Sequence, residues 1–153
     1  MKKSQKVVIE EFVEQLGLIA QADGLPRIAG RILGLMVIHA GPFSFSELGV
    51  LLKVSRGSIS TNTRVLENLG VIERTTRPGD RQDYFRLHEN PYVELMRGLQ
   101  NRMKKARHVV ADTREKLPVS DKAMQKRLAD LGDFYQQFID TTESMTNNED
   151  ANR

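Results

Sequence analysis

The chain has 153 residues and is mildly basic, with 23 lysines and arginines against 20 acidic residues and a formal net charge of +3. Its length fits a single domain and its hydrophobic content of 39% allows a packed core, whereas the lack of cysteine excludes disulfides and thiolate metal sites. No stretch approaches the roughly 18 uninterrupted apolar residues of a membrane span, so we expect a cytoplasmic protein, and the charge permits a nucleic-acid partner without requiring one.

Two amphipathic helices are expected at the N-terminal end. The basic residues at the start are not followed by a long apolar run, so this segment is not a signal peptide. Residues 5–22 then carry Ile9, Phe12, Leu16 and Ile19 at helical spacing. After the break at Ala-Asp-Gly, Pro26 suits the first turn of a second helix.

A helix-turn-helix is expected next. Ser44 and Glu47 have the spacing of a capping box, which predicts a short helix over Phe45 to Lys53. Ser55 is then placed to cap a following helix. Two short helices separated by a turn of a few residues are typical of this motif.

The second helix of this pair, SRGSISTNTRVLENLG, has two different faces. Ile59, Leu66 and Leu69 fall on one side and can anchor the helix in a core. The other side is small, polar and cationic, which suits entry into a DNA major groove, where hydroxyls and arginine can read base edges. A plain solvated face is the alternative. The residues on that side are Gly57, Ser60, Thr61, Arg64 and Asn68.

A β-hairpin is expected after Gly70. The segments VIERTT and DYFRL read as short strands, and RPGDRQ between them supplies turn residues. Arg77 and Arg81 would lie at its tip, giving a winged arrangement, and no other segment reads as a strand. Between Val54 and Arg86 all six basic residues are arginine, whose planar guanidinium favours phosphate and base recognition.

Residues 25–87 resemble the winged helix-turn-helix core of MarR-type regulators. The stretch SRGSISTNTRVLENLGVIERTTRPGDRQDYF is most similar to the GbsR-like branch, in which a recognition helix leads into a G-[DE]-R wing and an aromatic strand. The resemblance implies a homodimeric transcriptional regulator that binds double-stranded DNA, with a palindromic operator as the expected target. Members of the family often respond to small ligands, so we also expect a small-molecule effector, which the sequence does not identify.

The resemblance also implies roles for individual residues. Residues 55–64 would read DNA, Arg81 would enter the minor groove, and Asp80 would brace the wing. The chain departs from the family pattern at Asn62 and Thr63, where apolar residues are common, so the burial of these two is left open. The expected DNA-contacting residues are Ser55, Arg56, Gly57, Ser58, Ser60, Thr61, Arg64, Arg77, Arg81 and Gln82.

Two heptad-like segments follow Asn90-Pro91, from Tyr92 to Leu117 and from Met124 to Met145. They could pack within one chain against the first helix, or they could join two chains. We favour the second reading: residues 1–24 and 90–146 would form a dimerisation platform around the core at 25–87, all within one domain spanning 1–153. The expected interface residues are Tyr92, Met96, Leu99, Met103, Val110, Leu128, Leu131, Tyr135 and Phe138.

The predicted fold class is therefore mainly α with a small β-hairpin wing, flanked by long dimerisation helices. No nucleophile elbow or glycine-rich phosphate loop is present, and the three histidines lie on different expected elements, so we expect no enzyme, metal site or cofactor. The alternative function is a winged-helix adaptor that binds an acidic protein through its arginine face. The polar stripe of Ser60, Thr61 and Arg64 favours DNA over that alternative.

Overall fold

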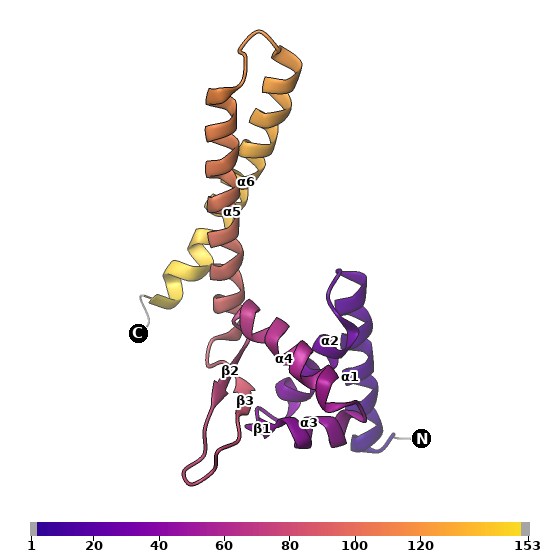
Figure 1. Ribbon diagram of the computed structural model, residues 1–153. Helices are drawn as coiled ribbons and strands as arrows, with labels where there is room; N and C mark the ends of the chain where they lie inside the picture. Colours follow the sequence, from indigo (N-terminus) through magenta and orange to yellow (C-terminus); the bar gives the residue numbers. More distant parts are fainter. Residues whose placement is uncertain (1–2, 151–153) are drawn as a thin grey trace. The chain divides into compact units, whose positions relative to one another are not determined.

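The computed structural model describes residues 3–150 and divides after Pro91 into two compact units (Figure 1). It is mainly helical with one small antiparallel sheet, which confirms the predicted fold class. None of the helices within residues 3–150 is long and apolar enough to cross a membrane. The elements in chain order are α1 Gln5–Ala22, α2 Arg27–Ile38, β1 Phe43–Ser44, α3 Phe45–Leu52, α4 Arg56–Leu69, β2 Ile72–Thr75, β3 Tyr84–Leu87, α5 Pro91–Lys116 and α6 Lys122–Asp150.

In the first unit, α1 packs closely along α2. A Cβ added to Gly30 of α2 would lie 2.6 Å from the Leu16 carbonyl oxygen of α1, so only glycine allows this approach. The core then extends from α2 to α3, α4 and the sheet, and its fully buried side chains hold the helix-turn-helix in place. They include Ile32, Met36, Leu48, Ile59 and Phe85.

The helix-turn-helix forms where the sequence predicts it. The Ser44 hydroxyl accepts a hydrogen bond from the Glu47 amide at 3.2 Å, and the Glu47 carboxylate accepts one from the Ser44 amide at 2.7 Å. This capping box starts α3 at Phe45, as expected, and the helix ends at Leu52. Lys53 then adopts a left-handed backbone with φ of 57°, which turns the chain towards α4.

The sheet contains one strand more than the predicted hairpin. Phe43 and Ser44 form β1, which pairs antiparallel with β3 and gives the strand order β1-β3-β2. The statement that only the hairpin reads as strand was therefore wrong. A two-residue strand is too short to show the alternation by which strands are recognised.

The two α4 residues whose burial the sequence left undecided, Asn62 and Thr63, are both buried. Asn62 is 6% exposed and Thr63 is 1% exposed. Each satisfies its donor on the helix itself, because the Asn62 amide donates to the Ser58 carbonyl and the Thr63 hydroxyl donates to the Ile59 carbonyl, both at 2.8 Å. These back-bonds allow polar side chains to face the core.

The second unit contains the antiparallel helices α5 and α6. Hydrogen bonds join Gln100 to Thr142 at 3.0 Å and Arg107 to Gln136. The most deeply buried α6 residues are Ile139, Thr142 and Thr146. Thr142 lies in the predicted heptad seam, in which Leu128, Tyr135 and Phe138 are half-buried.

Candidate nucleic-acid interface

The outer face of α4 has small, polar side chains and is exposed to solvent. Ser55 caps the helix by accepting a hydrogen bond from the Ser58 amide at 3.2 Å. A Cβ added to Gly57 would meet no atom within 4 Å, so an approaching ligand could come close to the backbone there. Ser55, Arg56, Gly57, Thr61 and Arg64 are exposed, and Ser58 and Ser60 are half-buried.

The arginines of this region divide into free and engaged side chains. Arg64 on α4 and Arg81 on the wing loop are exposed, and neither has a partner among residues 3–150. The Arg56 guanidinium lies 5.5 Å from the centre of the Phe45 ring. Arg77 lies 4.0 Å from the centre of the Tyr84 ring and donates to the Pro42 carbonyl at 3.0 Å. Arg77 is therefore held against the sheet rather than extended from the tip.

The wing loop is closed by Asp80. Its carboxylate accepts a hydrogen bond from the Tyr84 hydroxyl at 2.6 Å and another from the Gln82 amide at 2.9 Å. The bond from Tyr84 is the main cause that lowers the pKa of the Asp80 carboxyl below its usual value, and the same bond raises the pKa of Tyr84. Asp80 thus has the contacts of a bracing residue, while the Gln82 side chain remains exposed.

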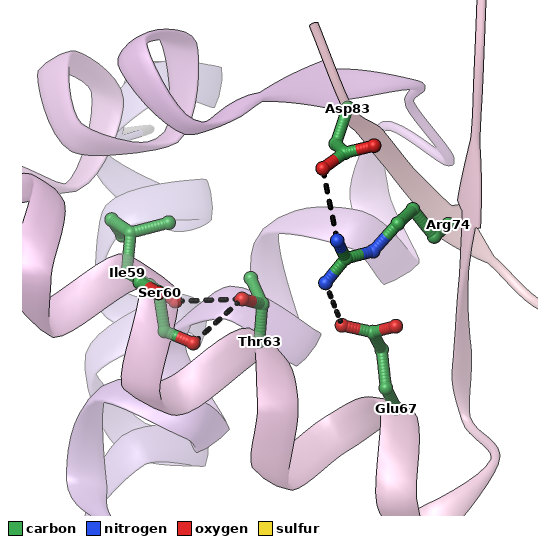
Figure 2. Close-up of polar contacts among 6 residues, drawn as sticks. All are labelled: Ile59, Ser60, Thr63, Glu67, Arg74 and Asp83. Carbon is green, nitrogen blue, oxygen red and sulfur yellow. Dashed lines mark hydrogen bonds and ion pairs between the residues drawn. The ribbon is translucent and has the colours of Figure 1, made fainter.

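Arg74 joins α4 to the base of the wing (Figure 2). One guanidinium nitrogen lies 3.0 Å from Glu67 of α4 and another lies 2.9 Å from Asp83, just before β3. The hydrogen bond to Glu67 is the main cause that raises the pKa of Arg74. Sequence reasoning counted Arg74 only as one of six arginines, because nothing local shows that residues 67, 74 and 83 meet.

The acidic residues of this region are all engaged inside the fold. Glu67 and Asp83 bind Arg74, Glu73 lies 2.7 Å from Arg86, and Asp80 binds Tyr84. Six arginines against four acids leave residues 54–86 with a formal charge of +2. Arg64 and Arg81 carry positive charges that no carboxylate of the described residues pairs. The placement of charge therefore favours an anionic partner more than the net charge of +3 does.

A cleft of about 660 Å³ lies between α1, α2 and the end of α3. Ile9, Leu35 and Leu51 give it an apolar lining. Arg31 crosses it: one nitrogen donates to the Leu52 carbonyl at 2.8 Å, and Nε lies 2.7 Å from the Glu14 carboxylate. Glu14 also accepts a hydrogen bond from Arg27, which is the main cause that lowers its pKa. These contacts connect α1 to the turn of the helix-turn-helix.

The expected interface residues of the second unit differ in exposure. Tyr92 is 62% exposed and Leu131 is 41% exposed, whereas Val110 is only 7% exposed. Val110 packs within its own unit, since a Cβ on Gly132 of α6 would lie 3.4 Å from it. Val109 and Phe134 are exposed apolar residues that the prediction omitted, and Met145, the end of the predicted second heptad segment, is exposed too. The remaining expected interface residues are half-buried: Met96, Leu99, Met103, Leu128, Tyr135 and Phe138.

The fold and this surface define a winged helix-turn-helix protein, and comparison with known proteins gives its family. A model of the MarR family matches residues 23–83. A crystal structure of a transcriptional regulator superposes with a TM-score of 0.85 at 30% identity, covering 94% of this chain and 98% of that one. The chain therefore belongs to the MarR family of winged-helix transcriptional regulators.

Curated relatives match part of the chain. The HTH-type transcriptional regulator MmpR5 of Mycobacterium tuberculosis is 47% identical over 86 residues, which cover 56% of this chain and 52% of MmpR5. The putative HTH-type transcriptional regulator YvaV of Bacillus subtilis is 25% identical over 96 residues, or 60% of this chain and 54% of YvaV. The chain thus spans about half the length of these relatives. Their names place them among HTH-type transcriptional regulators, with YvaV as a putative one.

Proposed function

We propose that the protein is a cytoplasmic, homodimeric regulator that binds double-stranded DNA at a palindromic operator. The observation that carries this proposal is the pair of exposed arginines, Arg64 on α4 and Arg81 on the wing, whose side chains pair with no carboxylate among residues 3–150. Arg64 would hold a guanine through two hydrogen bonds in the major groove. Arg81 would enter a narrow, A·T-rich minor groove.

The first turn of α4 would contact the DNA backbone. Ser55 and Ser58 have small side chains and Gly57 has none, so the amides of Arg56 and Gly57 at this helix N-terminus are open to a phosphate. Thr61 lies one turn further and would face the bases. Arg77, which the sequence assigned to direct contact, would instead support the wing from the position it occupies against Tyr84.

A dimer would be built from exposed apolar surfaces on α1 and on the second unit. Val8 and Ile19 of α1 are exposed although other residues of the same helix pack on α2, and Tyr92 and Phe134 are exposed in the second unit. Exposed apolar side chains that gather into a patch favour association with another protein surface. Two protomers would place two copies of α4 about one DNA turn apart, which matches a palindromic site.

Membership in the GbsR-like branch is proposed from the recognition helix, the Gly79-Asp80-Arg81 wing and the aromatic strand that follows it. We further propose that the expected small-molecule effector binds in the cleft crossed by Arg31. A ligand there would compete for the Arg31 guanidinium and so loosen the Leu52 carbonyl at the helix-turn-helix turn. A thermal-shift screen tests this, because ligands that stabilise the protein should also change its affinity for DNA.

The function is tested by selecting bound fragments from genomic DNA and measuring Arg64→Ala on the selected site. The variant should lose about 1–3 kcal/mol on that site and much less on random DNA, because a base contact is lost. Wild-type binding should also weaken steeply with salt. Equal losses on both DNAs would make Arg64 a phosphate contact. If no fragment is enriched, the adaptor function becomes the better explanation of the arginine face.

A further inference from the structure

Arg74 binds two carboxylates that belong to different parts of the first unit. Glu67 lies in the last turn of α4, whereas Asp83 lies where the wing loop returns to β3. Different nitrogens of one planar guanidinium make the two contacts, as Figure 2 shows. A rigid fork fixes both partners relative to each other, which a single flexible ammonium group would not do.

The same guanidinium is also tied to the sheet. It lies 5.2 Å from the centre of the Phe85 ring, which is fully buried. Phe85 packs edge-on against Phe45 of α3 with ring centres 5.0 Å apart, and Arg56 lies over the Phe45 ring. A continuous row of contacts therefore runs from Arg74 to the first residue of α4, so α4 is linked to the wing through both of its ends.

We propose that Arg74 is a positioning residue that fixes the wing against α4, so that the two contact DNA in one register. Arg74 does not need to touch DNA for this. Its ion pairs are partly exposed and contribute little stability by themselves, so their consequence is geometric. The inference rests on the proposed function, because it assumes that α4 and the wing both bind DNA.

Arg86 provides a matched control on the same hairpin. It is an exposed arginine with an ion pair of similar length, 2.7 Å to Glu73. Glu73 and Arg86 face each other across β2 and β3, so this pair lies within the wing. Replacing Arg86 therefore removes an ion pair from the hairpin but removes no contact with α4.

The experiment is a double-mutant cycle on the selected DNA site, with A·T-rich and with G·C-rich flanks. Arg81→Ala is measured in wild type, in Arg74→Gln and in Arg86→Gln. In wild type and in Arg86→Gln it should weaken binding to the A·T-flanked site by the same factor. In Arg74→Gln that factor should shrink by at least about twofold, the lower range for coupled residues, and preference for A·T flanks should fall.

Each outcome has one meaning. An equal loss from Arg81→Ala in all three backgrounds would overturn the positioning role while leaving the proposed function intact. No loss from Arg81→Ala and none from Arg64→Ala, even in wild type, would overturn both proposals. If Arg74→Gln fails to fold, Glu67→Ala removes the α4 contact while retaining Arg74, and it must reduce the effect of Arg81→Ala in the same way.

Discussion

Asn62 occupies a buried position of α4 where an apolar side chain would ordinarily be expected. Its amide donates to the Ser58 carbonyl, but its carbonyl oxygen has no hydrogen-bond partner within residues 3–150. A buried acceptor left without a partner costs about 1–3 kcal/mol. The position therefore carries a cost that the fold does not require.

Replacing Asn62 by Leu should stabilise the protein by about 1 kcal/mol, because the unpaired oxygen is removed and the shape is nearly kept. Urea unfolding measures the change. Thr63→Val is the control: its hydroxyl already has a partner in the Ile59 carbonyl, so its removal should destabilise the protein by about 0.5–1.5 kcal/mol rather than stabilise it. A destabilised Asn62→Leu would mean that the oxygen has a partner after all.

Residue identities alone could not reveal which arginines are free. The sequence shows six arginines and four acids between positions 54 and 86, and their pairing depends on how the hairpin closes over α4. Capping, in contrast, is local. For that reason the Ser44–Glu47 capping box could be predicted from its spacing, whereas the Glu67–Arg74–Asp83 cluster could not.

At the scale of elements, the wing depends on the hydrogen bond between Tyr84 and Asp80. The bond lowers the pKa of Asp80, so its contribution is present above the ordinary Asp pKa and is lost as pH falls through the folded value. It raises the pKa of Tyr84, so the contribution is lost again as pH rises through that folded value. The hydrogen bond between Tyr84 and Asp80 therefore stabilises the folded state fully between about pH 4 and pH 10.

Tyr84→Phe should be less stable than wild type inside that pH window and should approach wild type below it, as pH falls through the folded pKa of Asp80. Unfolding measured across a pH series tests this, and an NMR titration should find the pKa of Asp80 closer to its ordinary value in the variant. A constant difference between the two proteins from acidic to neutral pH would contradict the role of this bond.

Elements also differ in how well the sequence predicted them. The start of α3 and the hairpin strands followed from caps and turn residues, whereas β1 is defined only by its pairing with β3. In α6, apolar residues occur at several spacings. Ile139 rather than Leu131 is buried, because the contact with α5 selects the line Ile139, Thr142 and Thr146. Heptad spacing alone cannot choose among such lines.

At the scale of the whole molecule, the proposed dimer can be tested by introducing two glutamates into the expected interface. Met103 is half-buried and Leu131 is 41% exposed, so glutamates there should be tolerated by a single chain better than by an interface. Met103→Glu with Leu131→Glu should prevent dimerisation, because unpaired buried charges cost several kcal/mol each. Affinity for a full palindrome should then fall towards that for a half-site.

Sedimentation and gel shifts measure the two effects. Lys104→Glu is the control, since Lys104 is exposed on α5 and the variant introduces a comparable charge. It should remain dimeric. A wild-type protein that sediments as a monomer while binding its palindrome tightly would rule out the dimer.

The tie from α1 to the helix-turn-helix turn has a thermodynamic consequence. Glu14 of α1 holds Arg31, and Arg31 holds the carbonyl of Leu52 at the end of α3. A molecule that moves α1 or displaces Arg31 would change the free energy of operator binding. Linkage is reciprocal, so DNA must change the affinity for that molecule by the same factor. An effector that weakens DNA binding tenfold should bind tenfold more weakly to the protein on its operator, and the occupied operator would thereby set the effector concentration needed to release it.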